Sequence, residues 1–360
     1  MNKVRYILLL LLFLLPVTGS QAFAASGGQE PFDAPKVIFE HLKDAYEWHI
    51  TTIGDKHISI PLPVIVYSER AGWQLFSSSV FHEGEEYNGF YLSRHGDNEG
   101  KVVERNAAGN EQRPLLDVSI TKNVLAIFLN GALLCIIMLL TSRWYRKRGD
   151  SNAAPRGFVG AMEAIVTMVI DDVIKPNVGE KWARFTPYLL TVFFFILLSN
   201  LMGLIPIFPG GANVTGNIAV TLALALCTFV AVNVFGNKEY WKEILWPDVP
   251  IWMKFPIPLM PVIEMFGIIS KPFALTIRLF ANILAGHTVL IALSCLVFIS
   301  VSMGTTMNVV MTIFSVLLSV FMLVLELLVA YIQAYVFTML SAVFIGLSRK
   351  EHHPSHAPKK

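Results

Sequence analysis

Polar side chains that could carry or hold charge lie inside two long apolar stretches of the chain. The stretches run from about residue 256 to 303 and from 308 to 347. Ionisable groups inside membrane segments are costly, and by default they indicate an ion pathway. The side chains of this kind in the two stretches are Glu264, Lys271, Arg278, Asn282, His287, Glu326 and Gln333.

Proton affinity divides these residues into relays and a fixed charge. Arginine keeps its proton at any relevant pH, so Arg278 cannot relay a proton, but it can hold a carboxylate ionised and repel other cations. Histidine and glutamate can relay protons because modest changes of environment bring their pKa values into range. His287 with Glu326 would form one relay and Glu264 another, with Arg278 as the barrier between them. The chain offers no evident carboxylate for Arg278, so we expect a second protein to supply it.

The spacing along two antiparallel helices predicts the depth of each group. His287 follows Arg278 by nine residues, which is about 13 Å of helix. Glu326 precedes Gln333 by seven residues, or about 10 Å. If the first helix runs outward and the second returns, Arg278 and Gln333 share one level, and His287 and Glu326 share a more external one. Glu264 would lie about 20 Å from Arg278 towards the cytoplasm.

The helical period also predicts which side chains share a face. Arg278 and Asn282 are four residues apart and share one, as do Glu326 and Gln333, which are seven apart. At about 100° per residue, His287 lies about 180° round the helix from Arg278. We therefore expect Arg278 to face one partner and His287 to face another cavity.

Each of these residues also has a purely structural interpretation. Arg278 could form an ion pair with Glu264 or Glu326, although Glu264 lies three to four turns away. Lys271 is typical of a side chain that snorkels to the cytoplasmic headgroups. The amides Asn282 and Gln333, or His287 with Glu326, could simply join helices by hydrogen bonds, and Glu264 could be an interfacial carboxylate.

Composition places these residues in an integral membrane protein. The chain has 360 residues, of which 54% are hydrophobic and 15% charged, against about 25% charged in soluble domains. A net charge of +2 is too small to suggest nucleic acid as a partner. No phosphate loop, zinc spacing or nucleophile elbow is present, and His49, His57, His82 and His95 match no metal template. We expect no cofactor.

The N-terminal part predicts a signal peptide followed by a polar domain. Residues 1–24 have a basic start, a short apolar core and a small-x-small ending, typical of a cleaved secretory signal; a membrane anchor is the alternative. Residues 25–118 would then form an extracytoplasmic N-terminal domain. Alternating β-branched and aromatic residues predict short strands within residues 57–68 and 87–93, and residues 94–100 predict a turn.

Residues 119–348 predict a membrane domain of about five transmembrane helices. Residues 123–142 carry no charge and are long enough to span, and the basic run that follows places that end in the cytoplasm. Residues 156–178 predict an amphipathic helix at the cytoplasmic face. Residues 185–208 cross outward and residues 218–236 return, and the tail, 349–360, is cytoplasmic. Each of the two long stretches is either one strongly tilted helix or contains extra crossings.

Four sequence motifs resemble subunit a of F-type ATP synthases. SKPFALTIRLFANILAGH and ELLVAYIQAYVFTMLSAVFI are similar to its two long helices, and SNLMGLIPIF with TGNIAVTLALAL is similar to the preceding helix pair. The resemblance covers roughly residues 118 to 348 and says little about the domain before it. It implies an all-α polytopic membrane protein in which the two long helices are steeply tilted against a ring of small subunits.

The resemblance implies a role for each polar residue at its own position. The family's essential arginine falls on Arg278, its nearby amide on Asn282 and its glutamine on Gln333. The outer half-channel of the family uses an acid and a histidine, and here the two have exchanged places as His287 and Glu326. The carboxylate of the inner half-channel falls on Glu264.

The function that the resemblance implies is proton conduction by a non-catalytic stator subunit. The implied partners are the rotor ring of subunit c, the peripheral-stalk subunit b, the F1 ATPase and the lipid bilayer, in a bacterial inner membrane. Sodium coupling stays open because the surroundings of the rotor carboxylate decide it. A stand-alone transporter would be expected to show internal repeats, which are not evident, and a structural scaffold would not need intramembrane Arg, His and Glu.

Overall fold

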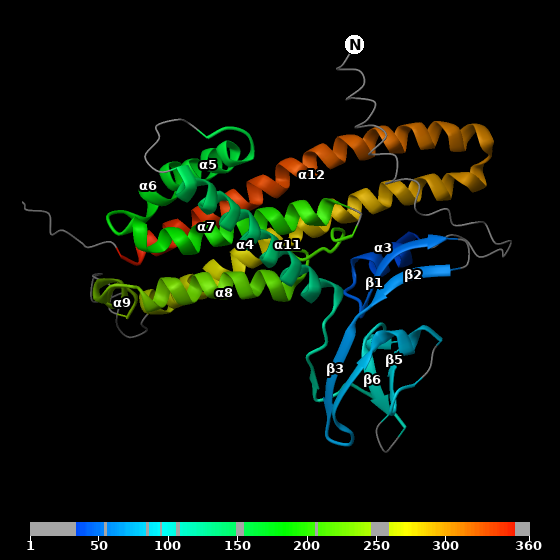
Figure 1. Ribbon diagram of the computed structural model, residues 1–360. Coiled ribbons are helices and arrows are strands. Elements are labelled where there is room, and N and C mark those ends of the chain that lie inside the picture. Colours follow the sequence, from blue (N-terminus) through cyan, green and yellow to red (C-terminus); the bar gives the residue numbers. More distant parts are fainter. Residues whose placement is uncertain are drawn as a thin grey trace, which may run out of the picture. The chain divides into compact units, whose positions relative to one another are not determined.

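The structure is a computed structural model that describes most of the chain (Figure 1). The described residues are 34–53, 56–83, 86–93, 96–105, 109–148, 155–205, 208–245 and 259–349. The predicted signal peptide, the first residues of the predicted N-terminal domain and the tail beyond Arg349 lie outside them. The chain forms two compact units, divided at positions that include the middle of both long helices. Each unit is described by itself.

Helices long and apolar enough to cross a membrane confirm the predicted fold class. Among the described residues, four qualify by length and composition: α4 (Lys122–Arg148), α7 (Trp182–Leu204), α11 (Leu259–Ser300) and α12 (Thr305–Leu347). A fifth is counted if α8 (Ile218–Val234) and α9 (Lys238–Leu245), which meet at a bend of 101°, form one broken span. The small N-terminal region contains the predicted strands.

The two long apolar stretches are each one continuous helix. α11 has 42 residues and α12 has 43, so each is about 63 Å long, against a bilayer core of about 30 Å. The turn between them contains a short 3₁₀ segment, Val301–Met303, and Gly304, whose φ of 99° favours glycine. The Ser300 hydroxyl donates to Asn308 Oδ1 at 2.8 Å across this turn. Helices this long must tilt or protrude to fit a bilayer.

The core of the helical unit is built from apolar stripes on its helices. Leu275, Leu279 and Ile283 recur every four residues and are at most 3% exposed, so they define the inner face of α11. On α12 the inner face includes Ala334 and Phe337. These residues belong to one buried cluster with side chains of α7 and α8.

Residues 158–178 are helical throughout, as the apolar periodicity predicts. They form α5 (Phe158–Met168), one turn of π-helix (Val169–Ile174) and α6 (Lys175–Val178). The apolar stripe of Met162, Val169, Val173 and Val178 is buried in the same core cluster. The stripe therefore packs against protein within its unit.

The N-terminal domain contains a helix and three small antiparallel sheets. Its elements are α3 (Ala34–Leu42), β1 (Glu47–Ile53), β2 (Lys56–Pro61), β3 (Pro63–Ser68), β4 (Gly72–Ser77), β5 (Phe90–Leu92), β6 (Val102–Arg105), β7 (Glu111–Gln112) and β8 (Leu116–Asp117). The strand orders are β1-β2, β4-β3-β8 and β5-β6-β7. Val64, Val66, Phe76, Phe90 and Val102 form its core. The predicted strand region 57–68 is two strands separated at Leu62.

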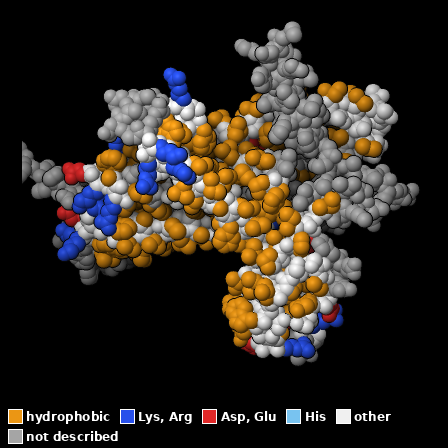
Figure 2. Space-filling model, viewed as in Figure 1, with side chains coloured by type: hydrophobic (Ala, Val, Ile, Leu, Met, Phe, Trp, Pro, Cys, Tyr) orange, Lys and Arg blue, Asp and Glu red, His pale blue; other side chains and the backbone are white. Residues whose placement is uncertain are grey.

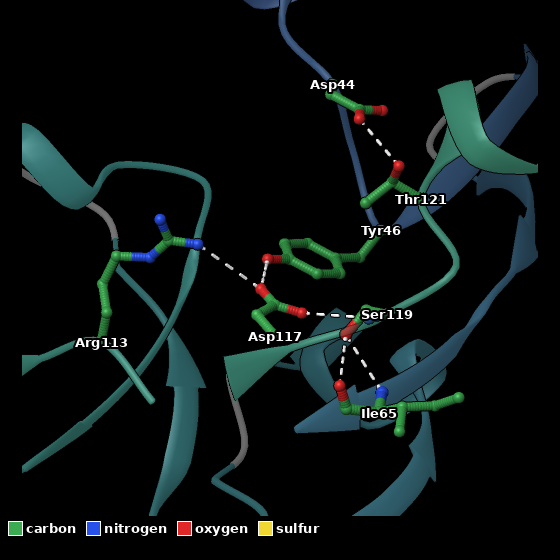
Figure 3. Close-up of polar contacts among 7 residues, drawn as sticks. All are labelled: Asp44, Tyr46, Ile65, Arg113, Asp117, Ser119 and Thr121. Atoms are coloured by element: carbon green, nitrogen blue, oxygen red, sulfur yellow. Dashed lines mark hydrogen bonds and ion pairs between the residues drawn. The ribbon is translucent and has the colours of Figure 1, made fainter. Parts of the chain in front are cut away.

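A polar network joins this domain to the first turn of α4 (Figure 3). Asp44 accepts hydrogen bonds from the Thr121 hydroxyl at 2.7 Å and from the Asn123 amide at 3.1 Å. A carboxylate at this position satisfies a free amide of the helix start and complements the helix dipole. Asp117 accepts from the Tyr46 hydroxyl at 2.5 Å and from the Ser119 amide at 3.1 Å.

Candidate functional site

Arg278 and Asn282 lie on the exposed face of α11, opposite its packed face. Both are exposed, whereas Leu275, Leu279 and Ile283 on the other side of the helix are buried. The shared face that the spacing predicts is therefore present. Around this face the helix is apolar, so Arg278 presents a permanent charge on a surface otherwise suited to lipid or to another helix.

Arg278 has no oppositely charged partner among the described residues. Among the residues that the structure describes, no carboxylate forms an ion pair with Arg278. The other exposed residues of this face are mostly small: Ala274, Ala281 and Ala285. Small side chains allow a second helix to approach a membrane helix closely. This face therefore leaves space for a second helix, and the charge of Arg278 would be balanced by a carboxylate on that helix.

Gln333 occupies a different environment from Arg278. It lies on α12 and is 6% exposed, between the buried Ala330 and Ala334. No hydrogen bond between Gln333 and Arg278 occurs among the described residues. The shared level predicted for Arg278 and Gln333 stays a prediction.

Glu326 is a buried carboxyl group that lies directly against α11. It is 4% exposed. A Cβ atom added to Gly286 would lie 2.9 Å from Glu326 Oε1 and 3.1 Å from its Cδ. Any residue other than glycine at position 286 would displace the Glu326 carboxyl group from this position. The sequence did not single out Gly286, because its role depends on the helix opposite and not on its neighbours in the chain.

His287 follows Gly286 directly but belongs to the other compact unit. Within that unit its imidazole lies near Gly203, where an added Cβ would be 3.5 Å from His287 Nε2. The predicted pairing of His287 with Glu326 crosses the division between the units and stays a prediction. Gly203 is a second residue that sequence reasoning missed. Its importance comes from the close approach of the His287 ring to its backbone, which the sequence alone does not reveal.

A buried amide fixes α12 one turn beyond Glu326. Asn200 of α7 donates from Nδ2 to the Ala330 carbonyl at 3.3 Å and accepts at Oδ1 from the Thr215 hydroxyl at 2.5 Å. Asn200 and Thr215 are at most 3% exposed. A satisfied buried amide of this kind holds neighbouring helices in register. Sequence reasoning passed over Asn200, although an amide within an apolar helix is a visible signal.

Glu264 lies near one end of α11 and interacts electrostatically with Tyr240 of α9. Its side chain is half-buried. Tyr240 lines a small hollow of about 10 Å³ whose walls are mainly apolar, with Thr228, Asn233 and Lys271 as its other polar side chains. The buried Asn233 Oδ1 accepts no hydrogen bond from the residues that the structure describes.

Basic and aromatic side chains gather at the end of the bundle that holds α6 and α9. Figure 2 shows Lys and Arg side chains concentrated there, whereas hydrophobic side chains cover the length of the bundle. Arg184 lies 4.8 Å from the centre of the Phe235 ring, and Arg349 lies 5.3 Å from that of Phe185. Aromatic and basic belts of this kind are typical of a membrane–water boundary.

Comparison with known families decides what kind of chain this is. A family described as ATP synthase A chain matches residues 125–346, which is more than half of the chain. The chain belongs to the ATP synthase A chain family. A second match, to a domain of unknown function (DUF8433), covers residues 37–122. The two matches meet where α4 begins.

Members of the family with curated names are similar over two thirds of this chain. ATP synthase subunit a of Chlorobium phaeobacteroides (strain DSM 266) is 44% identical over 247 residues, which are 67% of this chain and 68% of the relative. ATP synthase subunit a 2 of Chlorobaculum tepidum is 44% identical over 249 residues, or 67% and 66% of the two chains. ATP synthase subunit a of Myxococcus xanthus is 41% identical over 252 residues, or 67% and 77%.

Membership of the family and the helices of the structure together identify a multi-pass membrane protein. The family match contains all of α7, α8, α11 and most of α4 and α12. It therefore also contains every residue that the sequence analysis selected as a candidate for ion transport.

Proposed function

We propose that this chain is the stator subunit that conducts protons through the membrane part of an F-type ATP synthase. The observation that carries the proposal is Arg278, a permanent cation exposed on a small-residue face of a long apolar helix. No carboxylate in the described part of the chain forms an ion pair with it. A rotor ring that presents one carboxylate per subunit would supply the missing partner. The relatives' names, ATP synthase subunit a, support the same assignment.

Two paths would lead protons to and from the rotor carboxylate. On the outer side, His287 and the buried Glu326 receive the proton and pass it to the ring. On the inner side, the proton leaves past Glu264, near one end of α11. Glu326 suits a relay because its carboxyl group is held against Gly286. Each charge that crosses the membrane is worth about 2.3 kcal/mol per 100 mV.

Arg278 would separate the two paths by charge alone. At about 4 Å and an effective dielectric constant of about 20, it would attract a carboxylate by about 4 kcal/mol. The passing rotor carboxylate therefore gives up its proton before it passes Arg278, and no proton can cross directly between the paths. Asn282, four residues along on the same exposed face, is placed to contact the same rotor helix.

The proposal includes the orientation, the partners and the division of the chain. The basic end of the bundle faces the cytoplasm, with the C-terminus on the same side, and the N-terminal domain, residues 25–118, lies outside after removal of the signal peptide. The membrane domain, residues 119–348, would contact the ring of subunit c and the peripheral-stalk subunit b. It has no catalytic role, because the synthesis of ATP belongs to the F1 part of the complex.

Reconstitution of the complex tests this function. The chain, tagged at its C-terminus and purified from native membranes, should carry with it an oligomeric ring and a soluble ATPase. In proteoliposomes free of sodium, an imposed pH gradient should drive ATP synthesis. A chain that purifies alone would contradict the stator assignment, and synthesis that needs a sodium gradient would contradict proton coupling.

A further inference from the structure

One sheet of the N-terminal domain is apolar on both faces. Within β4-β3-β8, Val64 and Val66 point into the domain core and are 0% exposed. Successive side chains of a strand point to opposite faces, so the other face carries Ile65 and Tyr67 of β3, with Trp73 and Leu75 opposite them on β4. An antiparallel sheet with one face in water normally carries polar side chains there.

This second face is exposed, large and free of charge. We call it the outer sheet face and define it as Ile65, Tyr67, Trp73, Leu75, Leu116 and Val118. Trp73 is 61% exposed, Leu75 68% and Val118 57%. Figure 2 shows hydrophobic side chains gathered on the side of the domain where β3 lies in Figure 1. A contiguous apolar patch of this kind marks an interaction site.

The charged side chain of β8, Asp117, is turned away from the outer sheet face. Asp117 lies between Leu116 and Val118 in the chain, and its carboxylate accepts the hydrogen bond of the partly buried Tyr46 on the other side of the sheet. On the outer side, the rings of Tyr67 and Trp73 lie against each other with centroids 5.2 Å apart. Tyr and Trp are the side chains that membrane–water boundaries favour, because their rings are apolar and their N–H and O–H groups reach water.

The strand that borders this face continues into a membrane helix. The Val118 amide donates to the Ile65 carbonyl at 2.9 Å, and the Ile120 amide donates to the Pro63 carbonyl at 3.1 Å. Only Thr121 separates Ile120 from the start of α4 at Lys122. Two residue steps from Ile120 to Lys122 span at most about 7 Å, so the sheet is held beside the start of α4.

The junction between the sheet and α4 is also fixed by hydrogen bonds. Asp44 binds the Thr121 hydroxyl and the Asn123 amide, and the Lys122 amide donates to the Ala45 carbonyl at 2.8 Å. Near it, Trp48 packs edge to face on Phe208 of the loop that follows α7, with centroids 5.3 Å apart. Figure 3 shows the Asp44–Thr121 hydrogen bond of this junction.

We propose that the outer sheet face lies on the surface of the lipid bilayer beside α4, with Tyr67 and Trp73 at the level of the headgroups. Lipid is the occupant because the last residue of the face, Val118, is followed after only three residues by α4, a helix long and apolar enough to cross the bilayer. The docking gives the domain a second attachment to the membrane and holds the outer end of α4 in a fixed orientation. The proposal goes beyond proton conduction and does not depend on it.

Quenching of a fluorescent label by lipid tests the docking. The full-length chain, with Cys135, Cys227 and Cys295 replaced by Ser, would carry Leu75→Cys labelled with bimane and be reconstituted in phosphatidylcholine–phosphatidylglycerol nanodiscs. Gln112→Cys in β7, exposed on another sheet of the same domain, is the matched control. Nitroxide on the lipid headgroup and upper acyl chain is the lipid probe, and iodide is the aqueous probe.

The expected result is opposite quenching at the two positions. Lipid nitroxide should quench the label at position 75 at least about twofold more strongly than at position 112, because an interfacial face sinks about 5–10 Å into the headgroup region. Iodide should show the reverse order. Equal quenching by both probes would overturn the proposal. A label at position 75 shielded from both probes would also overturn it, since a protein surface would then cover the face.

A second label position guards against a local effect of the substitution. Leu116→Cys lies on β8, across β3 from Leu75, and belongs to the same outer sheet face. It should give the quenching pattern of position 75. If position 116 behaves like position 112 instead, the face as a whole does not lie on lipid.

Discussion

At the scale of single residues, burial divides the candidates into two kinds. Arg278 and Asn282 are exposed, whereas Glu326 and Gln333 are buried. An exposed charge on an apolar helix implies a partner outside the chain, and a buried carboxyl group implies a relay inside it. Under the proposed function, the rotor ring and the proton paths would therefore use different faces of the same helices.

The outer relay can be tested by exchanging its two members. If His287 and Glu326 act as a pair, His287→Glu combined with Glu326→His keeps one acid and one base in the path. The double variant should therefore retain more ATP-driven proton pumping than either single change, measured by quenching of a pH-sensitive dye in inverted vesicles. A double variant no better than the single ones would show that the two residues do not act as a unit.

The sequence predicted the charged and amide candidates but not the residues that position them. A charge within an apolar run is visible in one dimension, so Arg278, His287 and Glu326 could be selected without a structure. Gly286 and Asn200 could not be selected in this way. What matters at these positions is the atom that lies opposite, namely the Glu326 carboxyl group and the Ala330 carbonyl.

At the scale of elements, the long helices need close packing at their ends. The chain at Gly346 of α12 lies so near the backbone of Asn177 in α6 that a Cβ atom would overlap the Asn177 carbonyl oxygen. Hydropathy predicted where these apolar stretches lie, but it did not decide whether each was one helix. The turn at Gly304 and the packing of the inner faces decide it.

Substitution of Gly346 tests that packing. Gly346→Ala must push α12 and α6 apart, and overpacking of this kind costs about 1–3 kcal/mol. The melting temperature of the full-length chain in detergent should fall. Gly267→Ala in α11 is the control, because nothing lies within 4 Å of its added Cβ. Equal melting temperatures for the two variants would show that α6 does not pack on α12 in this way.

The junction of the N-terminal domain makes an element-scale prediction that depends on pH. Burial raises the pKa of Tyr46, and its hydrogen bond to Asp117 raises it further. Because the pKa of Tyr46 is higher in the folded than in the unfolded chain, the contribution of its hydroxyl to the free energy of unfolding is complete below the unfolded pKa of about 10. This contribution is lost as the pH rises through the folded pKa. Tyr46→Phe should therefore destabilise the domain by about 1.5–3 kcal/mol at neutral pH, and the difference should narrow above about pH 10.

Subtilisin cleavage of the full-length chain in urea measures this difference at each pH. Tyr91→Phe is the control, because the Tyr91 hydroxyl makes a longer, exposed hydrogen bond of 3.3 Å to Glu111. It should cost much less than Tyr46→Phe at neutral pH. The difference in free energy of unfolding between Tyr46→Phe and the unsubstituted chain should shrink towards pH 11. A difference that stays constant would contradict the assigned role of the Tyr46 proton.

At the scale of the whole molecule, the chain consists of a membrane domain that matches the ATP synthase A chain family and, before it, an N-terminal domain that matches a family of unknown function. The membrane domain was predictable because its apolar runs and polar motifs are long and regular. The N-terminal domain was predictable only in part. Its strands are as short as two residues, and β8 pairs with β3 across a long separation in the sequence. Local patterns carry little information about such pairing.

The central claim is that Arg278 separates two proton paths, and its replacement by alanine tests this claim most directly. In proteoliposomes that contain the complete complex, Arg278→Ala should abolish ATP synthesis driven by a pH gradient. Passive proton permeability should rise once the F1 part is removed, because the barrier between the paths is gone. Ile277→Ala, the neighbouring exposed position, should keep synthesis. Undiminished synthesis in Arg278→Ala would contradict the account.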